Sequence, residues 1–119
     1  MQTSQKDFHK KLLGRLGERT AVKYLKEKGY KILEKNYKTH VGEIDIIAEK
    51  DGVVVFVEVK TRSNGSFGTP AEAVGYRKQE KYKKVAAEYL LKKKRTENEC
   101  RFDVFGIENG EIEHIENAF

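Results

Sequence analysis

The residues best suited to chemistry lie in one acidic and apolar stretch of this 119-residue chain. Asp45, Glu58 and Lys60 stand in two runs rich in Ile and Val, which Asp51-Gly52 separates. Because Asp-Gly is a strong signal for a two-residue hairpin turn, we expect two paired strands here. In that register Asp45 lies directly opposite Glu58, and Glu43 lies opposite Lys60.

Two carboxylates facing each other across a hairpin need compensation, because like charges directly opposite each other are destabilising. They can share a proton, take a side-chain cation as partner, or bind a metal ion. Hard oxygen ligands on adjacent strands suit Mg²⁺ or Mn²⁺. Lys60, on the same strand face as Glu58, is placed to orient or deprotonate a water molecule, which favours hydrolysis of a phosphate ester. The alternative is an exposed, charge-rich face on which Lys60 only screens Glu58.

The same register divides the hairpin into two faces. One face is apolar and is expected to pack on the core through three cross-strand pairs: Val55 with Ala48, Val57 with Ile46, and Val59 with Ile44. The reverse face carries Glu43, Asp45, Ile47, Phe56, Glu58 and Lys60. Since its carboxylates flank large apolar side chains, this position favours a site over a solvated surface.

An amphipathic helix is predicted over residues 5–28, between a cap at Ser4 with Asp7 and the stop signal at Gly29. Glu18 falls inside the apolar arc of this helix, where a carboxylate needs a partner. A local ion pair between Arg15 and Glu18 would satisfy it.

The remaining patterns complete a mixed α/β domain. A second helix is predicted from a cap at Thr69, Pro70 and Glu72 to about residue 94, with a break near Gly75. Strands are predicted at residues 30–38, 42–49, 53–60, 101–107 and 111–118. The order is α-β-β-β-α-β-β, a mixed sheet flanked by helices, within a single domain of residues 1–119.

Composition and charge narrow the class of protein. With one cysteine the chain has no internal disulfide and no thiolate zinc site. We find no pattern for a secretory leader or a membrane span and expect a cytoplasmic protein. Residues 1–40 and 61–95 each carry a net charge of +7 around an acidic hairpin segment. Basic faces attract phosphate backbones, although lysine-rich helices are also often merely solvated.

The hairpin residues resemble the PD-(D/E)xK nuclease signature, with Asp45 followed by Glu58-Val59-Lys60. The resemblance extends over essentially the whole chain and is specific to the YraN family, small bacterial proteins classed as predicted endonucleases and distantly similar to archaeal Holliday-junction resolvases. Its residues are Gly17-Glu18, Gly29-Tyr30, Asn36-Tyr37, 42–48, 56–62, Phe67-Gly68, 101–104 and 116–119.

This resemblance implies a restriction-endonuclease-like core with its active site on the hairpin. It implies that Asp45 and Glu58 are metal ligands, with the Val59 carbonyl as a third, and that Lys60 positions the attacking water. Glu18 matches the acidic residue that related resolvases bring from their first helix. Glu43 replaces the proline of the motif, so the resemblance leaves its role open. Related nucleases often add a Gln or Lys from the following helix, for which the candidates are Lys78 and Gln79.

The leading hypothesis is a Mg²⁺- or Mn²⁺-dependent endonuclease. The resemblance implies that DNA is preferred over RNA, and branched or junction DNA over plain duplex. The alternatives are a catalytically weak or inactive nucleic-acid-binding module of the same fold, and a structural or interaction protein. Cutting both strands of a symmetric junction would require a homodimer. The candidate nucleic-acid contacts are Arg62, Arg77, Lys78, Gln79, Lys81, Lys84 and the run from Lys92 to Arg95.

Other candidate residues are assigned structural roles. The three histidines are scattered and do not have zinc-site spacing. Asp103 is interpreted as a buried hydrogen-bonding group, and Cys100 as an inert thiol. The spacing of Tyr76, Tyr82 and Tyr89 fits helix packing better than base stacking.

Overall fold

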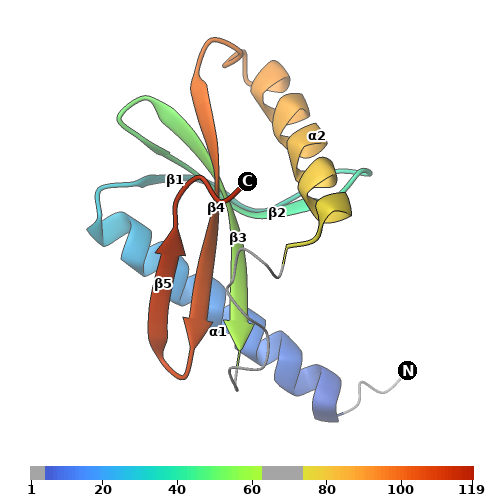
Figure 1. Ribbon diagram of the computed structural model, residues 1–119, viewed down its shortest axis with the longest axis vertical. Helices are drawn as coiled ribbons and strands as arrows, with labels where there is room; N and C mark the ends of the chain where they lie inside the picture. Colours follow the sequence, from blue (N-terminus) through green and yellow to red (C-terminus); the bar gives the residue numbers. More distant parts are fainter. Residues whose placement is uncertain (1–4, 63–73) are drawn as a thin grey trace.

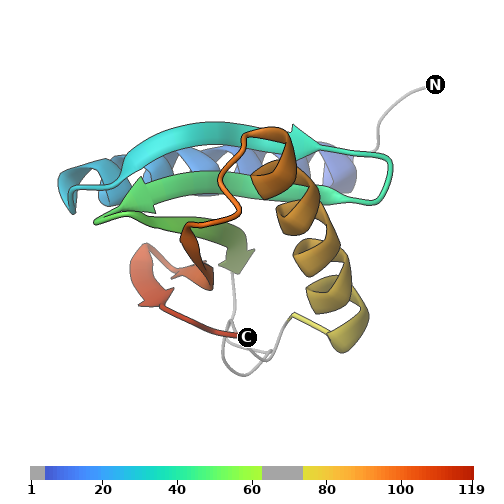
Figure 2. The same ribbon diagram turned by 90° about the horizontal axis from the view of Figure 1, so that it is seen from above.

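Five strands form one mixed sheet between two helices (Figures 1 and 2). The computed structural model describes the backbone of residues 5–62 and 74–119 and the side chains of residues 11–61 and 74–119. The strand order is β1-β2-β3-β4-β5, with β3 and β4 parallel and the other neighbours antiparallel. The predicted order α-β-β-β-α-β-β and the mixed α/β class are confirmed, and the architecture is compatible with a restriction-endonuclease-like fold.

The elements lie close to their predicted positions. They are α1 (Gln5–Glu27), β1 (Lys31–Lys38), β2 (Glu43–Lys50), β3 (Val53–Arg62), α2 (Tyr76–Lys92), β4 (Glu99–Glu108) and β5 (Glu111–Ile115). The last strand was predicted to reach residue 118 and ends at Ile115, because Asn117 has a left-handed φ of 51° that leaves the strand path. No helix in the described part of the chain is both long and apolar enough to cross a membrane.

Helix α2 begins at Tyr76. Its N-cap is Gly75, in an extended conformation, and Val74 is not helical. The predicted break near Gly75 is therefore confirmed as the helix start. The predicted caps at Ser4 and at Thr69 with Pro70 and Glu72 lie outside the described residues.

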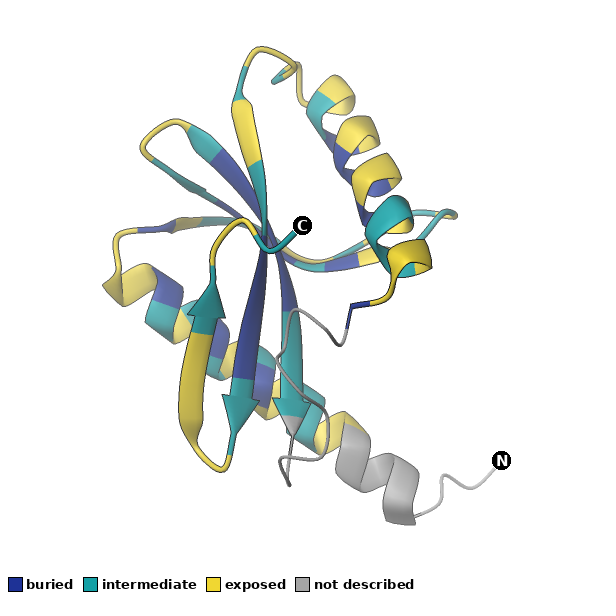
Figure 3. Cartoon of the chain, in the orientation of Figure 1, coloured by how far each residue is buried: buried dark blue, intermediate teal, exposed yellow. Residues whose placement is uncertain are grey.

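Both faces of the β2–β3 hairpin are buried (Figure 3). On the α1 side, Ile46, Ala48, Val55 and Val57 pack with Ala21 and Leu25. The reverse face, whose exposure was left open, is covered by α2, where Ile47 and Phe56 pack against Tyr82, Val85 and Tyr89. Burying each large apolar side chain contributes about 1.5–3 kcal/mol, so the hairpin is held rigidly from two sides.

Candidate active site

The candidate site begins where β2 and β3 stop pairing. The predicted register holds from Lys50↔Val53 to Ile46↔Val57. The turn residues Asp51 and Gly52 both have positive φ, as a type I′ hairpin turn requires. The pairing of β2 with β3 ends at Ile46↔Val57, so the β2 residues that precede Ile46 have no partner in the ladder with β3.

The predicted cross-strand pairs at the end of the hairpin are wrong. Asp45 does not pair with Glu58 in the ladder; its Oδ2 accepts the Val59 N–H at 2.9 Å. A continuing antiparallel ladder would give that N–H to the β2 backbone, so the carboxylate replaces a backbone acceptor. Glu43, predicted opposite Lys60, pairs with Lys38 of β1 instead.

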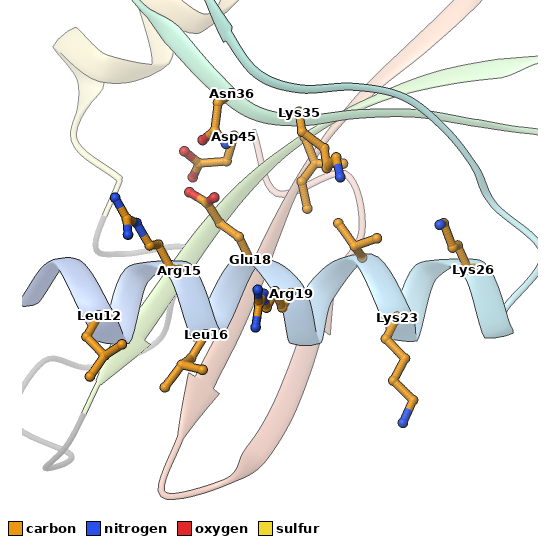
Figure 4. A pocket seen from close by; sticks show the side chains of 12 residues that line it. Leu12, Arg15, Leu16, Glu18, Arg19, Lys23, Lys26, Lys35, Asn36 and Asp45 are labelled. Atoms are coloured by element: carbon orange, nitrogen blue, oxygen red, sulfur yellow. The ribbon is translucent and has the colours of Figure 1, made fainter.

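Side-chain alternation also breaks at this point of β2. Ile44 was predicted on the same face as Ile46, but it packs on the α2 side while Ile46 packs on the α1 side. The neighbouring strand is irregular at the same level, because Asn36 has a left-handed φ of 51° between the pairs Lys35↔Ile46 and Tyr37↔Ile44. Asp45 therefore lines a cleft against α1 together with Asn36 (Figure 4).

The environment of Asp45 is unfavourable to its charge. Burial raises its pKa, the nearby Glu58 carboxylate raises it further, and the value reaches about 7 although the Val59 N–H opposes the shift. Glu18 adds a smaller contribution in the same direction. Asp45 thus lies within electrostatic reach of both other predicted carboxylates, Glu58 and Glu18.

Glu58 has two cationic partners. Its side chain is almost fully buried, and Oε1 lies 2.5 Å from Lys78 Nζ and 3.4 Å from Lys60 Nζ. Burial alone would lower the pKa of Lys78, but its hydrogen bond and charge interaction with Glu58, together with smaller contributions from Lys60 and Asp45, outweigh burial and raise the pKa above its usual value. Lys78 is therefore an ammonium at neutral pH and compensates a carboxylate that would otherwise be costly to bury.

Gly17 lets α1 bring Glu18 to the site. A Cβ at Gly17 would overlap the Oγ1 of Thr61 on β3, so only glycine permits this close packing of helix on strand. The next residue, Glu18, lines the cleft, and its carboxylate points toward that of Asp45 (Figure 4). The alternative partner for Glu18 is not observed, because the ion pairs of the described residues include none between Arg15 and Glu18.

The predicted nucleic-acid contacts have different positions. Lys78 lies in the site, whereas the Gln79 amide donates to the Val74 carbonyl at 2.8 Å and so supports the start of α2. Arg77, Lys81 and Lys84 are exposed on α2, and the Arg62 side chain lies outside the described residues.

Tyr82 and Tyr89 are buried as predicted for helix packing, but Tyr76 is 74% exposed. At 100° per residue, Tyr76 lies about 120–140° around α2 from Tyr82 and Tyr89, so it is not on the buried face. Cys100 is exposed and unpaired with any other cysteine.

A hard divalent cation fits part of this donor set. In the described residues no three His, Cys, Asp or Glu side chains are grouped closely enough to hold a metal ion. The N–H and C=O of one strand residue point to the same side of the strand, so the Val59 carbonyl lies on the side of Asp45. Asp45, Glu58 and this carbonyl are oxygen donors of the kind Mg²⁺ and Mn²⁺ prefer.

Asp103 belongs to a separate buried network. It accepts two hydrogen bonds from the Arg101 guanidinium, at 2.8 and 3.0 Å, and one from the Asn117 N–H; its Oδ2 lies 2.7 Å from His114 Nε2. Burial would raise the pKa of Asp103, but these hydrogen bonds outweigh burial and lower it. This agrees with the interpretation of Asp103 as a buried hydrogen-bonding group.

Two features of the site were not predicted from the sequence. Asn36 adopts a left-handed conformation beside Asp45, and asparagine is among the few residues that adopt it readily. The second feature is the group of basic side chains that α1 contributes to the cleft. From the sequence, these residues were considered only through the net charge of residues 1–40. Their spacing along one helix face was the available signal.

Comparisons with known proteins agree over nearly the whole chain. The family model described as "Uncharacterised protein family UPF0102" matches residues 17–107. A UPF0102 protein of Alkaliphilus oremlandii is 52% identical over 115 residues, covering 92% of this chain and 98% of the relative. One of Thermodesulfovibrio yellowstonii is 52% identical over 107 residues (90% and 95%), and one of Clostridioides difficile is 49% identical over 108 residues (89% and 95%). The chain therefore belongs to the UPF0102 family, as its resemblance to YraN proteins predicted.

Proposed function

We propose that this protein is a metal-dependent endonuclease of the PD-(D/E)xK superfamily that hydrolyses phosphodiester bonds in DNA. The observation that carries the proposal is the parting of β2 from β3 at Asp45, with Glu58 and Lys60 on the facing strand. A sheet that served only as scaffold would have no need to give up backbone pairing around buried carboxylates. By family resemblance the preferred substrate is branched or junction DNA, cut by a cytoplasmic homodimer.

In this proposal Asp45, Glu58 and the Val59 carbonyl hold Mg²⁺ or Mn²⁺, with Glu18 reaching the same place from α1. The cation, when bound, supplies positive charge that offsets the charge developing on the phosphate. Lys60 donates a hydrogen bond from its ammonium group and orients the attacking water. Lys78, whose side chain is 44% exposed, is long enough to move from Glu58 toward a substrate phosphate.

One observation favours a second candidate function. Lys60 and Lys78 both contact Glu58, so side-chain cations already neutralise one of the carboxylates that a metal would use. A stable arrangement of this kind suits a catalytically weak or inactive nucleic-acid-binding module of the same fold. That module would bind DNA by its basic faces without cutting it.

Incubation of the purified protein with single-stranded, duplex, flap and four-way-junction DNA separates the two functions. Each substrate is tested with Mg²⁺, with Mn²⁺ and with EDTA, beside the Asp45→Asn variant. The endonuclease proposal expects metal-dependent cleavage by the wild type only. Binding of every substrate without cleavage would favour the binding module, and cleavage that persists in Asp45→Asn would indicate a contaminating nuclease.

A further inference from the structure

The cleft that Asp45 and Glu18 line extends along α1 as a basic groove. It has a volume of about 640 Å³ and lies between α1 and the edge of the sheet formed by β1 and β2 (Figure 4). Five exposed cations line it: Arg15, Arg19, Lys23 and Lys26 of α1, and Lys35 of β1. Glu18 and Asp45 line the same groove, so the cations continue directly from the candidate site.

The four α1 cations form one stripe along the helix. At 100° per residue, residues 15, 19, 23 and 26 fall within about 80° of the helix circumference. At 1.5 Å per residue they extend over about 16 Å. One strand of B-form DNA advances 3.4 Å per nucleotide, so the stripe is long enough to follow several consecutive phosphates.

The cations are available to an external anion. No ion pair between described residues involves any of the five. Charge complementarity therefore points to a polyanion, because a row of unpaired cations attracts a phosphate backbone and releases its counterions.

The groove is small and has an apolar component. Its volume is that of a pocket for a small molecule. Leu12 and Leu16 line it with 44% and 48% of their surface exposed, beside Val22 and Ile46. An unpaired nucleic-acid strand carries phosphates and also bases that are not engaged in pairing. Those bases are free to contact the apolar side chains of the groove, while the phosphates contact its cations.

We propose that this groove binds the backbone of an unpaired nucleic-acid strand and leads it to Asp45. The inference deepens the proposed function by naming the kind of strand that the site receives. Only the delivery of that strand to Asp45 rests on the proposed function. Binding along the groove itself requires no cleavage.

The test measures binding of a fluorescently labelled oligothymidylate by anisotropy, in EDTA and at several salt concentrations. The groove variant combines Arg19→Gln, Lys23→Gln and Lys26→Gln. The control variant combines Lys92→Gln, Lys93→Gln and Lys94→Gln, which remove the same charge from the end of α2 and its C-cap, on the other side of the sheet. Thermal melts first establish that both variants are folded.

We expect the groove variant to bind the single strand at least about tenfold more weakly at ~0.1 M salt. Its salt slope should fall by about 2, since each lost contact to a single strand removes ~0.7. The salt slope of the control variant should fall by less than half of that amount. Binding of a blunt duplex should weaken equally in both variants. Equal losses of single-strand binding in both variants, or a larger groove effect on duplex than on single strand, would overturn the inference.

The two proposals fail in different ways. A wild type that binds the single strand through the groove but cleaves no substrate with Mg²⁺ or Mn²⁺ overturns the endonuclease and leaves the groove intact. A wild type that cleaves, together with a groove variant that binds the single strand as the control does, overturns the groove and leaves the endonuclease intact.

Discussion

At the scale of single residues, Asp45 decides how the acidic group behaves. Its carboxylate substitutes for a backbone acceptor, lies near two other carboxylates and has its pKa raised to about 7. An aspartate in an unfolded chain has a pKa near 3.9. The folded protein therefore holds a proton on Asp45 through a pH range in which the unfolded chain has already lost it.

The stability of the metal-free protein should show this difference. Between about pH 4 and pH 7 the folded state binds more protons than the unfolded state, so this group makes the free energy of unfolding fall as pH rises. In Asp45→Asn that contribution is absent. We expect the advantage of the variant over wild type to grow from near zero at pH 4 to about 4 kcal/mol at pH 8, measured by urea unfolding in EDTA. A difference that does not change with pH would show that Asp45 ionises in the folded protein as it does in water.

Lys60 and Lys83 give a matched test of the attacking-water role. Lys60 contacts Glu58 in the site, whereas the exposed side chain of Lys83 on α2 pairs with Glu80. Lys60→Ala should lower the metal-dependent cleavage rate at least ~100-fold, the usual effect of losing a group that positions or activates a water. Lys83→Ala should cleave as wild type does. Each variant loses one positive charge, so similar DNA affinity in both is the control, and an unchanged rate in Lys60→Ala would remove Lys60 from the reaction.

At the scale of elements, the contact between α1 and β3 determines where Glu18 lies. Gly17 is packed against Thr61, while Gly14 of the same helix has open space around its Cα. Alanine in a helix interior is normally favoured over glycine by about 0.5–1 kcal/mol. The two glycines should therefore respond to the same substitution with opposite signs.

We expect Gly14→Ala to stabilise the protein slightly and Gly17→Ala to destabilise it by about 1–3 kcal/mol, as overpacking does. Gly17→Ala should also slow cleavage, because α1 must move away from β3 and carries Glu18 with it. Thr61→Ala removes an Oγ1 that has no hydrogen-bond partner among the described residues. Combining it with Gly17→Ala should therefore restore the stability and the cleavage rate that Gly17→Ala alone loses. Urea unfolding of the four variants measures this coupling. If Thr61→Ala restores neither stability nor cleavage, the close contact does not position Glu18.

The hairpin shows how far sequence patterns predict this site. Asp51-Gly52 determines the register, and five pairs follow it as far as Ile46↔Val57. The ladder rule fails beyond that point because it assumes backbone acceptors throughout, whereas Asp45 supplies a side-chain acceptor to Val59. The side of the sheet on which Ile44 packs was missed for the same reason, since alternation holds only in a regular strand.

Contacts between distant elements were less accessible from the sequence. Glu18 was noticed because a carboxylate in an apolar helix arc is unusual, but its nearness to Asp45 follows from the packing at Gly17. Lys78 was one of two candidates from α2. Its neighbour Gln79 was excluded only by the observed hydrogen bond to Val74, which no spacing rule predicts.

At the scale of the whole molecule, the sheet separates two basic helices that approach one acidic site. Helix α1 contributes the groove cations and Glu18, and α2 contributes Lys78 from the other side. The sequence showed two basic segments of equal net charge around an acidic one. It did not show that both would converge on the place where β2 and β3 part, because that depends on which face of the sheet each helix covers.

Thermal melts with EDTA and with excess Mg²⁺ show whether Asp45 and Glu58 form a metal site. A ligand that binds only the folded state stabilises it by mass action. We predict that Mg²⁺ raises the Tm of the wild type at pH 8, where Asp45 is ionised, and raises that of Asp45→Asn markedly less. In EDTA the variant should be at least as stable as the wild type. If Mg²⁺ shifts neither protein, or shifts both equally, the carboxylates hold no metal and the endonuclease proposal loses its chemical basis.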